Sequence, residues 1–180
     1  MPRSGDDIKH INQNRNRPDT LASLDVSVST GKLELHRLTS GSHEATAVYA
    51  KDFDHKGNWV WNEQRKPRTV VTVPYKCISL PESGGYVVLK RISSNDGSMP
   101  KRLLPAWLSR QTTGLKEVAI DNHLQYFHRD NQALSADEGL SLIAALRSEE
   151  SQAVIRSISG STQVNLADLA QLRFSLTESA

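Results

Sequence analysis

Alternating apolar and polar positions dominate the chain up to about residue 130 and predict β-strands. Residues 25–29 and 32–38 alternate on either side of Gly31, so they are expected to form a hairpin. Further strands are predicted at residues 46–50, 69–73 and 85–92, and a strand or pair of strands at 117–127. Apolar patterning also restarts at residues 101–108.

From Ser135 onward the apolar spacing becomes helical. Ser135 and Glu138 have the spacing of a capping box and are followed by apolar residues one helical turn apart. A second helix is predicted over residues 149–157, and Asn165 is expected to cap a third, short helix with Asp168 in its first turn. Strands first and helices last predict an α+β domain, with a mixed or antiparallel sheet and a helical C-terminal part.

Residues 1–17 carry almost no apolar periodicity, which predicts a flexible arm or a cut linker before a domain at residues 18–177. A chain of 180 residues fits one domain. It has no apolar run long enough to span a membrane and no secretory signal, so we expect a cytoplasmic protein. The single cysteine, Cys77, cannot form an internal disulfide and is expected to be an inert, half-buried thiol.

The sequence lacks the motifs of most enzyme classes. The six histidines are scattered and there is one cysteine, so no metal site is predicted. A nuclease-like grouping of Asp52, Asp54 and Lys56 lies in a loop and is best explained by chance. Trp59 and Trp61 would share one face of a strand, where they either pack in the core or offer a stacking platform for a base. A net charge of +2 permits nucleic-acid binding without requiring it.

Four short segments occur in an order that is typical of one family. They are Val-Ser-Thr-Gly at 28–31, Tyr-Val-Val-Leu-Lys-Arg-Ile-Ser-Ser at 86–94, Ile-Asp-Asn-His-Leu at 120–124 and Ser-Gly-Ser-Thr-Gln-Val-Asn at 159–165. In this order the chain resembles the C-terminal target-recognition domain of adenine-N6 DNA methyltransferases from restriction–modification systems. It departs from the family after Ser94, where Asn-Asp-Gly-Ser-Met-Pro replaces a charged run, and at residues 148–151, where Ser-Glu-Glu-Ser stands.

The resemblance implies a module that reads double-stranded DNA beside a methyltransferase catalytic domain, in the same or a separate chain. The family's Asn/Asp-Pro-Pro-aromatic motif and its glycine-rich S-adenosylmethionine segment are absent, so that cofactor is expected only in the parent enzyme. The chain would then be either a piece of a longer enzyme, as its polar start favours, or a free-standing specificity subunit. A non-specific DNA-binding or protein-binding module is the main alternative.

Candidate DNA contacts follow from the charged and amide side chains in and beside these segments. Amides can pair with base edges, hydroxyls can bond phosphate, and lysine or arginine neutralises phosphate. Gln163 is the best candidate for a base contact. Asn165 is better explained as a helix cap, and backbone-bonded structural roles remain open for Asn122 and His123. The full set is Lys90, Arg91, Ser93, Ser94, Lys101, Arg102, Asn122, His123, Ser161, Thr162, Gln163 and Asn165.

Overall fold

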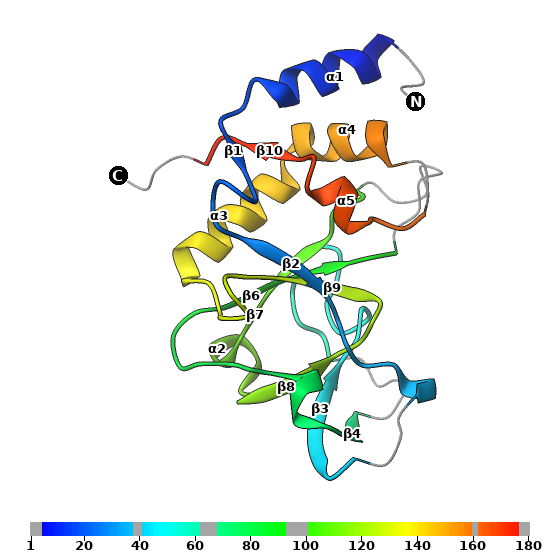
Figure 1. The fold of residues 1–180 in the computed structure, drawn as a ribbon, viewed down its shortest axis with the longest axis vertical. Coiled ribbons are helices and arrows are strands. Elements are labelled where there is room, and N and C mark those ends of the chain that lie inside the picture. Colours follow the sequence, from blue (N-terminus) through cyan, green and yellow to red (C-terminus); the bar gives the residue numbers. More distant parts are fainter. Residues whose placement is uncertain (1–4, 38–40, 62–67, 93–100, 160–161, 177–180) are drawn as a thin grey trace.

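The computed structural model describes residues 5–37, 41–61, 68–92, 101–159 and 162–176. Most of its helices gather at one end of the molecule, and its two four-stranded sheets lie toward the other (Figure 1). The α+β fold class predicted from the sequence is confirmed. The helices are α1 (Gly5–Arg15), α2 (Arg110–Thr113), α3 (Ala136–Arg147), α4 (Glu149–Ile158) and α5 (Leu166–Leu169), with 3-10 turns η1 (Leu35–Arg37) and η2 (Pro74–Lys76). The strands are β1 (Asp19–Thr20), β2 (Ser27–Thr30), β3 (His43–Val48), β4 (Thr69–Thr72), β5 (Cys77–Ser79), β6 (Gly85–Lys90), β7 (Pro105–Ser109), β8 (Glu117–Ile120), β9 (Leu124–His128) and β10 (Arg173–Phe174).

An antiparallel sheet of order β2-β9-β6-β7 forms the middle layer of the fold. Its strand β6 is buried on both faces, as its nearly unbroken apolar run requires. Val87 and Leu89 belong to the core shared with the helices, whereas Tyr86 and Val88 belong to the core on the opposite face. Successive side chains of β6 therefore point alternately into two separate cores.

A second sheet of order β4-β3-β8-β5 lies beyond the second core. Strands β3 and β8 are parallel, and the other two pairings are antiparallel. Residues on one face of this sheet, such as Val48 and Ile120, join the second core. On its other face, small residues such as Ala47 and Ala119 pack around Leu33 and Tyr49. The sheet is thus the third layer of the domain.

Helices α3 and α4 cover the middle sheet on the side away from the second sheet. The predicted capping box of α3 is present: Ser135 Oγ accepts from the Glu138 N–H, and a Glu138 carboxylate oxygen accepts from the Ser135 N–H at 3.0 Å. Gly139 of α3 lies directly against the Trp107 ring of β7, where a Cβ would overlap the ring. The glycine therefore sets how closely α3 approaches the sheet.

The structure differs from the prediction of a flexible arm at the N-terminus, because residues 5–15 form α1 against α4 (Figure 1). The docking uses polar side chains. Asn14 is buried, donates to the Gln171 carbonyl at 2.8 Å and accepts from the Arg173 N–H at 2.9 Å, and Ser157 donates to Asp7 at 2.8 Å. Apolar periodicity, on which the prediction depended, does not detect a helix docked by hydrogen bonds.

The predicted hairpin at residues 25–38 is wrong. Strand β2 pairs with β9, which lies a hundred residues further along the chain, with Val28 opposite Phe127. Residues 35–37 turn into η1, and Leu33 bridges to Asp121 instead. Alternation identified the buried face of these segments but carries no information on their strand partner. Within the described residues, no helix is long and apolar enough to cross a membrane.

Candidate nucleic-acid interface

Arg91, the residue after β6, holds together three of the segments in which DNA contacts were predicted. Its Nη1 donates to the Asn122 carbonyl at 2.9 Å, and its Nη2 donates to Gln163 Oε1 at 3.2 Å. The Arg91 backbone N–H donates to the His123 carbonyl at 2.9 Å. Four predicted positions, separated by up to 72 residues in sequence, therefore meet at one end of β6.

The segment 162–165 lies along this end of the sheet like a short extra strand. The Val164 N–H donates to the Arg91 carbonyl at 2.8 Å, and Ile92 and Gln163 form an antiparallel bridge. Val164 is fully buried, and buried Gln125 of β9 donates to its carbonyl at 3.1 Å. Thr162, Gln163 and Asn165 stay exposed. Because Val164 is anchored, the backbone that carries the exposed residues Thr162, Gln163 and Asn165 is held in place.

Asn165 begins helix α5, as the sequence predicted. Its backbone N–H donates to an Asp168 carboxylate oxygen at 3.2 Å, and its carbonyl accepts from the N–H groups of Asp168 and Leu169. The capping interpretation of Asn165 is therefore confirmed, and its position is explained without a ligand.

His123 is oriented by Asp121, a residue that the sequence analysis did not single out. Its Nδ1 lies 2.8 Å from Asp121 Oδ2. The Asp121 side chain is only 4 % exposed, whereas that of His123 is 48 % exposed. A carboxylate accepts hydrogen bonds, so Nδ1 carries the hydrogen and Nε2 is left as the ring nitrogen for an outside partner. The spacing Asp-x-His at the end of a strand was the signal available in the sequence.

Lys90 does not join this surface, since strand neighbours point to opposite faces. Its Nζ donates to the Phe53 carbonyl at 2.7 Å and lies 4.6 Å from the centre of the Phe53 ring. Burial lowers the pKa of Lys90. In this position the ammonium group stabilises the turn around Phe53 and is directed into the protein.

Arg102 is also internal, with an exposed fraction of 1 %. Its guanidinium donates to Ser159 Oγ at 2.9 Å, and Ser159 Oγ in turn donates to the Gln163 carbonyl at 3.3 Å. A side chain this buried cannot reach a phosphate in this conformation, so its position fits a support beneath Ser159 and Gln163. Lys101 lies apart from the Arg91 surface, close to the Arg147 carbonyl (3.4 Å).

Gln152 of α4 is a second support that the sequence analysis missed. It is fully buried, and its amide bonds four backbone groups of the segment before β7 and of the end of α3. The signal available in the sequence was the position of Gln152, a polar residue three positions before Ile155 on the apolar face of the predicted helix. The candidates Ser93, Ser94 and Ser161 lie outside the described residues.

The electrostatics of the surface depend mainly on Arg91. Among the described residues, no carboxylate forms an ion pair with it, and its guanidinium donates to the Asn122 carbonyl and to the Gln163 amide oxygen. Neutral acceptors orient the guanidinium without cancelling its charge. The surface therefore combines a fixed cation, an exposed imidazole and exposed amide and hydroxyl groups, which are the groups used to contact phosphates and base edges.

The nuclease-like residues have structural roles. Asp54 accepts from the backbone N–H groups of Lys56 and Asn58 at 2.8 and 2.9 Å and so closes its own loop. Asp52 is fully buried and forms an ion pair with Arg68 at 2.6 Å. Neither carboxylate is arranged as part of an acidic pair for a metal-dependent reaction.

The core-packing interpretation of the two tryptophans is supported. Trp59 and Trp61 stack with ring centres 5.1 Å apart, and Trp59 also contacts Phe53 at 5.4 Å. The Trp59 indole N–H donates to the Trp107 carbonyl at 2.7 Å, and Arg68 lies over the Trp61 ring. Both rings are partly buried against the second core.

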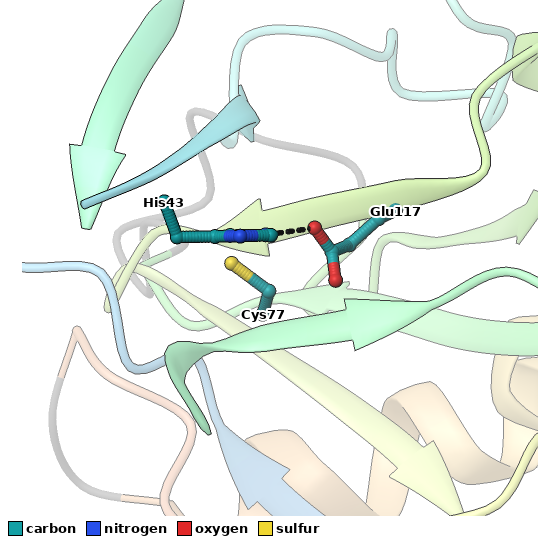
Figure 2. A group of neighbouring side chains, drawn as sticks. All are labelled: His43, Cys77 and Glu117. Carbon is teal, nitrogen blue, oxygen red and sulfur yellow. Dashed lines mark hydrogen bonds and ion pairs between the residues drawn. The ribbon is translucent and has the colours of Figure 1, made fainter. Parts of the chain in front are cut away.

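Away from this surface, the fold brings together a cluster that sequence spacing did not reveal. His43, Cys77 and Glu117 come from three strands of the second sheet, and their ligand-type atoms all lie within 4.8 Å of one another (Figure 2). Burial, with Glu117 nearby, raises the pKa of Cys77 to about 11. The pKa agrees with the inert thiol expected at neutral pH, but the expectation of no metal-type cluster is corrected. A cavity of about 450 Å³, lined in part by Cys77, Tyr75 and Tyr126, contains none of the predicted DNA contacts.

Comparison with known proteins relates nearly the whole chain to part of larger enzymes. It is 23 % identical over 168 residues to the Type II methyltransferase M.PstI of Providencia stuartii, a match that covers 89 % of this chain and 33 % of that protein. It is 25 % identical over 161 residues to the Type II methyltransferase M.BsuBI of Bacillus subtilis, covering 86 % of this chain and 32 % of that protein. No family model and no solved structure matches the chain. The chain is therefore similar, as a distant relative, to about one third of the length of two Type II methyltransferases.

Proposed function

We propose that this chain is the sequence-specific, DNA-binding target-recognition domain of an adenine-N6 DNA methyltransferase of a restriction–modification system. The observation that carries the proposal is the arrangement at Arg91, whose guanidinium connects the Asn122–His123 turn to Gln163. All four residues belong to segments that resemble the target-recognition domains. The distant similarity to two Type II methyltransferases supports a role in DNA methylation.

In this proposal some residues position the duplex by contacting its phosphates, and one residue reads its base sequence. Arg91 neutralises a phosphate while it holds Gln163 in place, and His123 and Thr162 bond the phosphate backbone. Gln163 offers an exposed amide, which can pair with two atoms on one adenine edge. Lys90 and Arg102 stabilise the scaffold beneath.

The methyl transfer itself belongs, in this proposal, to a catalytic domain in the same or a separate chain. That domain binds S-adenosylmethionine and extrudes the target adenine from the duplex, while this chain clamps the DNA in the cytoplasm. Calorimetry of the 180-residue chain with S-adenosylmethionine should detect no binding heat. Saturable binding with micromolar affinity would contradict this division of labour.

DNA recognition is tested by selecting bound duplexes from a random library with the 180-residue chain and sequencing them. We expect enrichment of one short motif. Fluorescence anisotropy then compares the selected duplex with a shuffled one across a range of salt concentrations. Bound sequences without any enriched motif would favour the non-specific module, and no binding at low salt would reject a DNA-binding role for the chain alone.

Variants then separate positioning from reading. Gln163→Ala should cost about 1–3 kcal/mol on the selected duplex and much less on the shuffled one. Arg91→Ala should weaken binding to both duplexes and reduce the salt slope by about 1. Arg110→Ala is the matched control, because Arg110 follows β7 at the opposite end of β6 and pairs with Glu82. If Gln163→Ala lowered the affinity for both duplexes equally, residues 161–165 would have a scaffold role and would not read the sequence.

A further inference from the structure

The cluster of His43, Cys77 and Glu117 is built on three neighbouring strands of the second sheet. Each residue is the first of its strand, and the strands are adjacent in the order β3-β8-β5. Cys77 lies opposite Ala119, and Ala119 lies opposite Ala47. Glu117 is two residues before Ala119, and His43 is four before Ala47, so all three side chains project from the same face of the sheet.

The side chains between them are small and buried. Ala45, Ala47 and Ala119 occupy the strand positions beside the cluster. Figure 2 shows the Glu117 carboxylate directed at the edge of the His43 ring, with the Cys77 sulfur close beneath the ring. His43 Nε2 and Glu117 Oε1 are hydrogen-bonded. Cys77 Sγ makes a weak, 4.0 Å contact with the Val73 carbonyl.

The three donors match one class of metal ion. Imidazole nitrogen, thiolate sulfur and carboxylate oxygen are the ligands of zinc sites, and three protein ligands with a water molecule complete a tetrahedral shell. A dication bound to one thiolate, one carboxylate and one neutral imidazole also gives a site with no net charge. His43 Nε2 and Glu117 Oε1 already converge on one hydrogen, whose place a metal ion can take.

The distances fit after small side-chain movements. Metal–ligand bonds of about 2.0–2.3 Å place tetrahedral ligand atoms roughly 3.3–3.8 Å apart. The three donor atoms lie within 4.8 Å of one another before any ion enters. The side chains of His43 and Glu117 are 34 % and 37 % exposed, so they can adjust and an ion can reach them from solvent.

We propose that His43, Cys77 and Glu117 bind a divalent transition-metal ion of the zinc class, with water as the fourth ligand. The ion would connect β3, β8 and β5, at a site that is separate from the Arg91 surface. The proposal does not depend on DNA binding, and DNA binding measured in a chelator does not depend on the metal.

Cobalt(II) is the probe that reports the sulfur ligand directly. The chain has a single cysteine, so a near-ultraviolet thiolate-to-cobalt charge-transfer band can come only from Cys77. We expect this band to saturate at one cobalt per 180-residue chain and to disappear when zinc is added. Absence of the band at excess cobalt would overturn the proposal.

Substitutions test the other two ligands. Cys77→Ser should abolish the band, and His43→Ala and Glu117→Gln should weaken cobalt binding by more than the roughly 10–100-fold that loss of an outer-shell partner costs. His123→Ala is the matched control, because His123 also bonds a carboxylate, Asp121, but belongs to a different site. Unchanged affinity in both the His43 and Glu117 variants would overturn the three-ligand site.

A measurement on the unaltered chain keeps the test independent of how the variants fold. Zinc at one equivalent should slow alkylation of Cys77 by a maleimide, and a chelator should restore the original rate. An alkylation rate that zinc does not change would contradict coordination by the sulfur.

Discussion

Truncating Gln152 tests whether one buried amide holds the scaffold beneath the proposed DNA surface. Its Oε1 accepts from the N–H groups of Arg102 and Leu103 at 2.7 and 3.1 Å. Its Nε2 donates to the carbonyls of Leu103 and Leu146 at 3.1 and 2.9 Å. Gln152→Ala removes all four bonds from a side chain with no exposed surface.

The size of the loss follows from the groups left behind. Each buried backbone group deprived of its partner costs about 1–3 kcal/mol, so four give an upper range of about 4–12 kcal/mol. A water molecule that enters the vacated space restores part of this. We therefore expect a loss of about 4 kcal/mol from a domain whose total stability is roughly 5–15 kcal/mol.

Urea unfolding followed by circular dichroism measures this loss. With a slope near 2 kcal/mol per molar urea, the midpoint should fall by about 2 M while the slope stays constant. Gln171→Ala is the matched control, because Gln171 is exposed and its side-chain amide donates to the Ala167 carbonyl within the same segment. It should cost no more than about 0.5 kcal/mol. A loss below about 1 kcal/mol for Gln152→Ala would refute the reasoning, since the backbone groups would then find other partners at little cost.

Three further outcomes are expected. Gly139→Ala should destabilise the domain by about 1–3 kcal/mol in urea unfolding, because the added Cβ overlaps the Trp107 ring. The cost of this overlap outweighs the gain in helix propensity of about 1 kcal/mol. A stabilised variant would show that α3 can shift. Hydrogen bonds from Arg129 and then Ser135 lower the pKa of Glu138 to about 2, so its stabilisation is complete above the ordinary pKa near 4.5 and is lost as the pH falls toward 2. Glu138→Gln should flatten the dependence of the urea midpoint on pH between these values, and an unchanged slope would contradict the assignment. Lys90→Met should lower stability but leave the salt slope of DNA binding unchanged, because its ammonium group bonds the Phe53 carbonyl; a slope reduced by about 1 would instead mean a phosphate contact.

The sequence by itself determined the local elements of the domain. The capping box at Ser135 and Glu138, the cap at Asn165 and the strand β6 are all present where short-range patterns predict them. Caps and apolar periodicity depend on residues within a few positions of one another, so they can be identified without knowledge of the fold.

Only the tertiary structure decided which segments meet and where charged side chains point. It pairs β2 with β9, docks α1 by hydrogen bonds and brings Arg91 to Gln163 across 72 residues. It also turns Lys90 inward and buries Arg102, although charged side chains of this kind usually lie at the surface.

The metal-type cluster is the clearest case of this dependence. His43, Cys77 and Glu117 are too widely spaced in sequence to form a recognisable motif, and strand order alone makes them neighbours. A strand's pattern specifies which side chains share a face, whereas its neighbours are chosen by the free energy of packing the whole domain. For that reason the side chains proposed here to read DNA were visible in the sequence, and their arrangement around Arg91 was not.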